Sequence, residues 1–178
     1  MKLVRWRSVR VEVMSKIKRP ICWEDVTTPS MIVSDKKIVS AAEIKQFGMN
    51  FDPQPYHLDR DAAKTSIFGG LCASGWHVCA IMMRLLSDKL TSEGIQFIGN
   101  DEIPKLKWIE PVFEDDSVYA EIHLKEKQRD PSNVDFGIIS ADIAVKNQRE
   151  SDVMVLSAEL LVKARQHHDA WHHIYSKQ

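Results

Sequence analysis

An aspartate and a histidine five residues apart could carry out acid–base chemistry together. Asp52 and His57 are the ends of the stretch DPQPYH at residues 52–57. A carboxylate and an imidazole can each exchange a proton with a bound molecule, and an imidazole does so near neutral pH. The two prolines fix φ and push the residues before them toward extended conformations, so this stretch is predicted not to begin as a helix. We expect a rigid loop with a reactive group at each end.

Two helices are predicted after this loop. Residues 58–64 have an acidic first turn, which suits the positive end of a helix dipole, and should form a short helix. A turn signal follows at residues 66–70. Residues 71–86 are apolar on nearly every side, and a helix of that kind is usually enclosed. We therefore expect the second helix at the centre of the fold.

Strand signals fill the second half of the chain. Residues 118–124 alternate between apolar and polar as a half-buried strand does, and residues 136–145 and 153–162 are rich in β-forming types. Polar turns separate these runs at residues 128–133 and 146–150. One early helix followed by a late run of strands predicts an α+β fold.

Composition limits the classes of protein to consider. A chain of 178 residues can bury a single core and has no room for two full domains. The net charge of -1 shows no excess of basic residues of the kind that binds nucleic acid. The longest apolar run carries His77 and Arg84 and is too short to cross a bilayer. Cys22, Cys72 and Cys79 are odd in number and irregularly spaced, which favours a reducing compartment. We expect a soluble, cytoplasmic protein with no nucleic-acid or membrane partner.

The two ends of the chain differ from its middle. Residues 1–20 carry seven lysines and arginines against one acid, Glu12. We expect a flexible or strand-like extension there, with organelle targeting as the alternative.

In the tail at residues 165–178, His168 and His172 would share one helical face, as a metal-ligand pair does. No acidic or thiol third ligand is fixed nearby, so a solvated tail without a metal is the prediction.

The middle of the chain resembles the MaoC-like acyl dehydratases, the family that includes the (R)-specific enoyl-CoA hydratases. Their signature has an aromatic residue, then Asp-x-Asn-Pro-x-His-x-Asp, an alanine, a Gly-Gly pair, and a small residue before a glycine that opens a helix. The matching positions in this chain are Phe47, Asp52, Pro55, His57, Asp59, Ala63, Gly69, Gly70 and Gly75. The resemblance continues through a strand at residues 107–112 and an acidic turn at 114–116. It implies a single domain over residues 21–164.

The resemblance also implies a fold and an activity. In the hot-dog fold of this family, an antiparallel sheet wraps a long central helix and pairs with the sheet of a second subunit. The activity would be addition or removal of water across the 2,3 double bond of an acyl thioester, with acyl-CoA as the expected substrate and no cofactor. We expect a homodimer with its pocket at the subunit interface, because a one-layer sheet on one helix leaves an edge and an apolar face uncovered.

By the same resemblance, Asp52, His57 and Gly75 are the expected catalytic residues. Asp52 would take a proton from water while His57 orients that water, and the division of acid and base between the two stays open. The N–H of Gly75 would donate to the thioester oxygen as charge develops there, and the missing Cβ would let the substrate approach closely. The expected substrate-binding residues are Pro55, Tyr56, Gly69, Gly70, Ser74 and Trp76.

Several positions depart from the family pattern. Gln54 replaces the usual Asn, Ser74 stands where many hydratases have a His, and Met83 stands where they often carry a Ser near the catalytic Asp. The sequence therefore identifies no polar partner for Asp52. At residues 101–102 and 114–115 this chain has acidic residues where the relatives have other loop sequences. Their negative charge would repel the phosphates of coenzyme A.

Two other functions remain compatible with these residues. A thioesterase on the same scaffold would direct water at the thioester carbonyl instead of the β-carbon, and a non-catalytic acyl-thioester-binding subunit would tolerate the acidic loops. The Pro-x-His spacing favours the dehydratase over the thioesterase. His77 is interpreted as a packing residue. For Gly69 and Gly70 a tight turn that shapes the loop beside the pocket is favoured over direct contact with the substrate.

Overall fold

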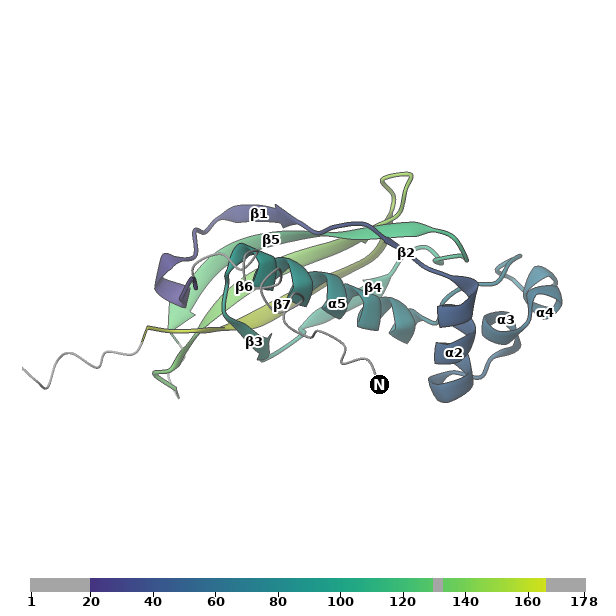
Figure 1. Ribbon diagram of the computed structural model, residues 1–178, viewed down its shortest axis with the longest axis horizontal. Coiled ribbons are helices and arrows are strands. Elements are labelled where there is room, and N and C mark those ends of the chain that lie inside the picture. Colours follow the sequence, from purple (N-terminus) through teal and green to yellow (C-terminus); the bar gives the residue numbers. More distant parts are fainter. Residues whose placement is uncertain (1–19, 130–132, 166–178) are drawn as a thin grey trace, which may run out of the picture.

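Three long strands form the middle of an antiparallel sheet, and one long helix lies against one face of it (Figure 1). The computed structural model describes residues 20–129 and 133–165. This is the α+β arrangement that the sequence predicts. The extension expected at residues 1–20 and the histidine tail expected at 165–178 lie outside the described residues, except for Pro20 and Arg165.

The sheet runs in the order β1-β5-β6-β7-β3, with β2 also pairing with β5 and β4 also pairing with β7. All of these pairings are antiparallel. The strands are β1 (Ser30–Val33), β2 (Lys37–Ile38), β3 (Phe97–Asn100), β4 (Lys105–Trp108), β5 (Ser117–Arg129), β6 (Phe136–Lys146) and β7 (Asp152–Lys163). The three long strands contain the runs expected at 118–124, 136–145 and 153–162. The strand expected at 107–112 instead ends at Trp108, shortly before Pro111, which has no N–H for a ladder.

The core lies between the sheet and α5 (Gly75–Glu93). On β6, Ile139, Ala141, Ile143 and Val145 are buried, so every second residue faces the helix. The buried residues of α5 are spaced three and four apart, as one face of a helix requires: His77, Val78, Ile81, Met82, Leu85, Leu86 and Leu90. This packing puts the N-terminal end of α5 at one end of the sheet, beside the smaller helices (Figure 1).

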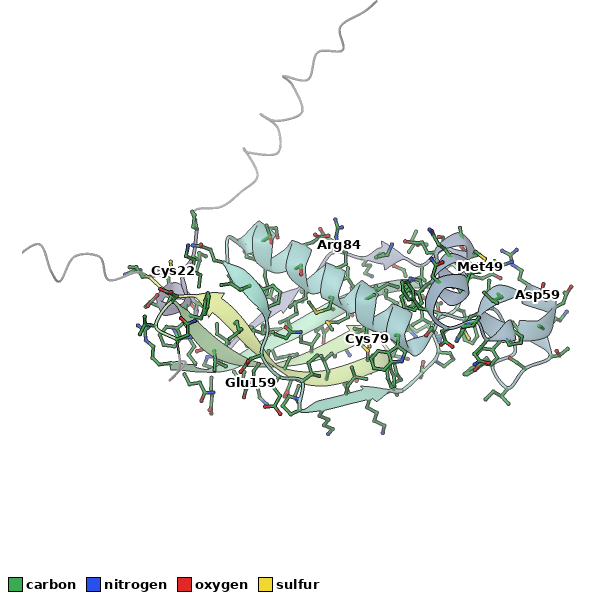
Figure 2. The ribbon with its side chains drawn as sticks, turned by 90° about the horizontal axis from the view of Figure 1, so that it is seen from below. Cys22, Met49, Asp59, Cys79, Arg84 and Glu159 are labelled. Atoms are coloured by element: carbon green, nitrogen blue, oxygen red, sulfur yellow. The ribbon has the colours of Figure 1, made fainter. Side chains whose placement is uncertain are left out.

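The structure agrees with one expectation about α5 and corrects another. The apolar run at residues 71–86 becomes helical only at Gly75, the residue that the resemblance places at the head of the helix, because Ser74 caps it and the residues before Ser74 are not helical. It is also not enclosed on all sides, since residues 76, 80, 84 and 88 form an exposed stripe that includes the Arg84–Asp88 ion pair. Figure 2 shows Arg84 on the side of α5 away from the sheet and Cys79 on the side toward it. The helix ends at Gly94, which has a φ of 85°.

The remaining helices lie at the two ends of α5 (Figure 1). At its N-terminal end, α2 (Ala41–Phe51), α3 (Pro55–Leu58) and α4 (Arg60–Lys64) follow one another. The 3-10 turn η1 (Trp23–Asp25) lies near its C-terminal end, where the N–H of Ile21 donates to the carbonyl of Gly94. The sequence analysis missed α2, although Ser40 and Glu43 form a capping box, which is a readable start signal. Among the described residues, no helix is long and apolar enough to cross a membrane.

The predicted loop at residues 52–57 is helical in its second half. Pro55 is the first residue of α3, a position where its missing N–H removes no hydrogen bond and its fixed φ suits a helix. The helix expected at 58–64 is interrupted at Asp59, whose carboxylate accepts hydrogen bonds from the N–H groups of Asp61 and Ala62, both at 2.9 Å. The expectation that the run does not begin as a helix is confirmed over residues 52–54, whereas the expectation of a loop over the whole stretch is wrong from Pro55 onward.

His77 joins α5 to α2 by stacking on Phe47. The two ring centroids lie 4.8 Å apart with an interplanar angle of 9°, and His77 is 7% exposed. Its Nδ1 is buried without a hydrogen-bond partner among the described atoms. Burial lowers the pKa of His77, with smaller effects from Glu43, Lys37 and His57. The packing role expected for His77 agrees with this environment.

Replacing His77 with Phe should flatten the dependence of stability on pH. Because the pKa of His77 is lower in the folded than in the unfolded protein, the unfolded chain binds more protons as pH falls through the ordinary histidine range. The wild type should thus lose stability below about pH 6.5. The His77→Phe variant should lose less, and at pH 7 its Tm should rise by about 2–4 °C if about 1 kcal/mol of desolvation penalty is removed.

The measurement is the Tm at pH 5 and pH 7.5 by circular dichroism. His123→Phe is the control, since His123 is exposed on β5. An unchanged difference in Tm between the two pH values in His77→Phe would contradict the assignment.

Candidate active site

The structure brings Asp52 and His57 together. The Nε2 atom of His57 lies 3.4 Å from Oδ2 of Asp52. Asp52 is the C-cap of α2, and its N–H donates to the carbonyl of Gly48 at 3.0 Å. His57 lies within the single turn of α3, so the Asp-Pro-x-Pro stretch folds the two side chains toward one another.

Gly48 allows this close approach of α2 and α3. A Cβ on Gly48 would lie 3.1 Å from Cβ of His57 and 3.0 Å from a side-chain carbon of Leu58. Any larger residue would have to push α3 away from α2. The sequence analysis did not single out Gly48, and its position one residue after the signature aromatic was the available signal.

A backbone carbonyl fixes the orientation of the His57 ring. His57 is 5% exposed, and its Nδ1 lies 2.7 Å from the carbonyl oxygen of Cys72. Because a carbonyl can only accept, Nδ1 carries the proton. In the neutral ring, Nε2 therefore presents its lone pair on the side of Asp52. This is the form of imidazole that can accept a proton from water.

Backbone pairing holds the Cys72 carbonyl in place. Residues 71–73 run antiparallel to residues 112–114, with an isolated bridge between Cys72 and Phe113. The N–H of Ala73 donates to the carbonyl of Val112 at 2.8 Å, and the N–H of Glu114 donates to that of Leu71 at 3.1 Å. The thiol of Cys72 is buried, which raises its pKa to about 11, so it stays protonated near neutral pH. Cys72 therefore acts in the site through its backbone.

Ser74 supplies the polar partner that the sequence does not identify for Asp52. Its Oγ lies 2.7 Å from Oδ2 of Asp52, and the side chain is buried. Met83, where the resemblance led us to expect a serine, contacts Asn100, whose Nδ2 lies 3.4 Å from the sulfur. Ser74 lines the cavity, where it was expected to bind substrate, but its hydroxyl is bonded to Asp52.

Gly75 is the first residue of α5, so its N–H has no acceptor within the helix. The positive end of the helix dipole lies at the same place. A Cβ on Gly75 would meet the indole of Trp108 at 2.8 Å. The missing Cβ of Gly75 was expected to leave space for the substrate, but Trp108 fills that space. The Nε1 of Trp108 donates a hydrogen bond to the Gly75 carbonyl at 2.9 Å.

A cavity of about 460 Å³ surrounds these groups. It is lined by Asp52, Tyr56, His57, Phe68, Cys72, Ala73, Ser74, Gly75, Trp76, Val78, Trp108, Ile109, Glu110, Pro111 and Val112. Trp108 and Glu110 were missed by the sequence analysis because they belong to no short motif and lie far along the chain from the signature, with Trp108 33 positions after Gly75. A second cavity of about 370 Å³ beside β1 contains Lys89 and Glu93, which already pair with each other at 2.9 Å.

Three of the expected substrate-binding residues lie outside the lining of this cavity: Pro55, Gly69 and Gly70. Pro55 starts α3 and is exposed. Gly69 has a φ of 72° and forms a tight turn, while Gly70 lies against Phe113. The turn role, which the sequence analysis favoured for the two glycines, describes their geometry.

Aromatic rings and paired charges surround the cavity. Trp76 and Trp108 meet edge to face, with centroids 5.4 Å apart. Arg60 binds Glu114 through two nitrogens, and this ion pair lowers the pKa of Glu114. Arg149 lies 3.8 Å from Glu110. Of the acids expected to repel phosphate, Glu114 is therefore neutralised by Arg60. Within residues 20–129 and 133–165, no three His, Cys, Asp or Glu side chains are grouped as metal ligands.

Comparison with known proteins places this site in a family. The family model described as MaoC like domain matches residues 23–142. The uncharacterized protein YdeM of Bacillus subtilis is 30% identical over 125 residues, which are 70% of this chain and 86% of that protein. The crystal structure of a MaoC-like dehydratase from Rhodospirillum rubrum is 36% identical, with a TM-score of 0.73, and the match covers 82% of this chain and 99% of that one.

A more distant structure has the same fold. The (R)-hydratase PhaJ1 from Pseudomonas aeruginosa is 21% identical with a TM-score of 0.66, and the match covers 82% of this chain and 88% of that one. The hot-dog fold and the family resemblance expected from the sequence are confirmed. The chain belongs to the MaoC-like domain family of dehydratases and hydratases.

Proposed function

We propose that this protein adds water to, or removes water from, the 2,3 double bond of an acyl thioester, with acyl-CoA as the substrate. The observation that carries the proposal is the Asp52–His57 pair, 3.4 Å apart and facing a cavity at the N-terminal end of α5. Both groups needed to move the protons of water lie on one side of the cavity, and a backbone donor, Gly75, lies on another part of its lining.

In the hydration direction, a water molecule would bind between the Asp52 carboxylate and Nε2 of His57. Asp52 accepts a proton from the water while the water oxygen forms a bond to the β-carbon. The π electrons of the double bond move onto the thioester, which becomes an enolate. The proton held by the Asp52–His57 pair then forms the C–H bond at the α-carbon, so the pair returns to its starting state. Dehydration follows the same steps in reverse.

The enolate needs a donor for its oxygen. The N–H of Gly75 has no acceptor within α5, and the dipole of this 19-residue helix adds positive potential at the same point. Such preorganised donors commonly contribute about 10²–10³ in rate. Gly75 also has to remain a glycine, because Trp108 occupies the space of a Cβ.

The exposed apolar residues near the cavity support a homodimer. Trp76 is 64% exposed and Trp108 is 42% exposed, and both line the cavity. On the same edge of the sheet as Trp108, Ile98 is 50% exposed. A second subunit on the β3–β4 edge would cover these side chains and complete the acyl-binding wall.

Asp52→Asn and His57→Ala should each lower the turnover of a short 2-enoyl-CoA at least about a hundredfold, because each removes one partner in proton transfer. The measurement is the loss of the conjugated enoyl-thioester absorbance. Asp61→Asn and His123→Ala are matched controls, since both residues are exposed and lie outside the cavity lining. Release of free thiol would identify a thioesterase. Binding of ligand without any turnover would identify a non-catalytic acyl-thioester-binding subunit.

Ile98→Glu should dissociate the dimer and reduce turnover per subunit. A charge buried at an apolar interface costs about 3 kcal/mol, so the dissociation constant should rise at least about a hundredfold. Sedimentation velocity at several protein concentrations measures this, with turnover followed on the same samples. Val134→Glu is the control, since Val134 is exposed between β5 and β6 and away from this edge. A wild type that is monomeric and fully active would contradict the dimer.

A further inference from the structure

We infer that Ser74 is a positioning residue for Asp52: its hydroxyl fixes the carboxylate in the orientation needed to accept a proton from water. The inference rests on the proposed function and adds a residue to its machinery.

The hydroxyl of Ser74 has one proton, and its surroundings determine where that proton points. The Oγ atom accepts a hydrogen bond from the N–H of Trp76 at 3.3 Å, as the N-cap of α5. It lies 2.7 Å from Oδ2 of Asp52, which as a carboxylate oxygen can only accept. The proton therefore points to Asp52. Ser74 is 2% exposed, so water competes little for this hydrogen bond.

This hydrogen bond gives the two carboxylate oxygens of Asp52 different roles. Oδ2 receives the proton of Ser74 and lies 3.4 Å from Nε2 of His57. Oδ1 has no hydrogen-bond partner among the described residues and is left to bind the water. In the part of the chain that the structure describes, Ser74 is the only side chain that donates a hydrogen bond to this carboxylate.

Asp52 needs such a restraint because of where it lies. It is the C-cap that follows α2, its side chain is 27% exposed, and free rotation would carry the carboxylate away from His57. Ser74 belongs to another element and follows Ala73, whose N–H is bonded to Val112. The hydrogen bond therefore ties the end of α2 to the start of α5, the two elements that carry Asp52 and Gly75.

A purely structural role as helix cap is the competing explanation, and substitutions can separate the two roles. Ser74→Ala removes both the cap and the donor. Ser74→Gly removes the donor, while glycine at an N-cap costs only a few tenths of a kcal/mol in stability. Ser74→Thr keeps both hydroxyl functions. A cap role predicts that activity follows stability, whereas a positioning role predicts equal losses of activity in Ala and Gly and recovery in Thr.

The experiment measures kcat, KM and Tm for hydration of a four-carbon 2-enoyl-CoA by the full-length protein. Ser74→Ala and Ser74→Gly should each lower kcat by about 10- to 100-fold, with KM changed by less than about threefold. Ser74→Thr should stay within about threefold of the wild type. In an Asp52→Asn background, where no carboxylate remains to be positioned, Ser74→Ala should cause no further loss of kcat.

Two outcomes overturn the inference while the proposed function stands. One is a Ser74→Gly variant with the kcat of the wild type. The other is a loss of kcat in Ser74→Ala that is equally large in the Asp52→Asn background, since Ser74 would then act independently of Asp52. If the wild type itself does not turn over any 2-enoyl-CoA, the proposed function and this inference are both wrong.

Discussion

A short antiparallel backbone pairing between residues 71–73 and 112–114 holds the site together. It contains a bridge between Cys72 and Phe113 and the hydrogen bond from Ala73 to Val112. On one side it presents the Cys72 carbonyl that orients His57, and at its end it places Ser74 as the cap of α5. Backbone hydrogen bonds do not depend on side-chain rotamers, so this arrangement is rigid where the chemistry needs rigidity.

The polar groups at the centre of the site are buried and partnered. His57 and Ser74 are both buried, and each has a short hydrogen bond that fixes its orientation. A buried polar group without a partner costs free energy, so each partner stabilises the fold as well as the geometry of the site. His77 is the contrast, because its stacking on Phe47 holds the helices together while its Nδ1 has no described partner.

Charge around the cavity is balanced more than the sequence suggests. Glu114 belongs to an acidic turn, yet Arg60 of α4 lies against it in the fold. Arg60 and Glu114 are 54 positions apart, so no local pattern could reveal their pairing. The exposed aromatic side chains at the mouth of the cavity, Trp76 and Trp108, come together from α5 and β4 in the same way. Long-range contacts of this kind set the electrostatics and shape of the opening.

The sequence by itself determined the fold class and the reactive pair. Alternating apolar residues predicted the three long strands, and the signature around Asp52 and His57 identified the family, because periodicity and short fixed spacings are local properties. The start of α3 at Pro55 was misjudged, although proline at the first helical position follows from equally local rules. Tertiary structure alone decided the partners of the reactive groups: the carbonyl of Cys72 for His57, the hydroxyl of Ser74 for Asp52, and the indole of Trp108 beside Gly75. Each of these contacts joins segments at least 15 positions apart. Only the packing of α2, α5 and the sheet brings such segments within hydrogen-bonding distance.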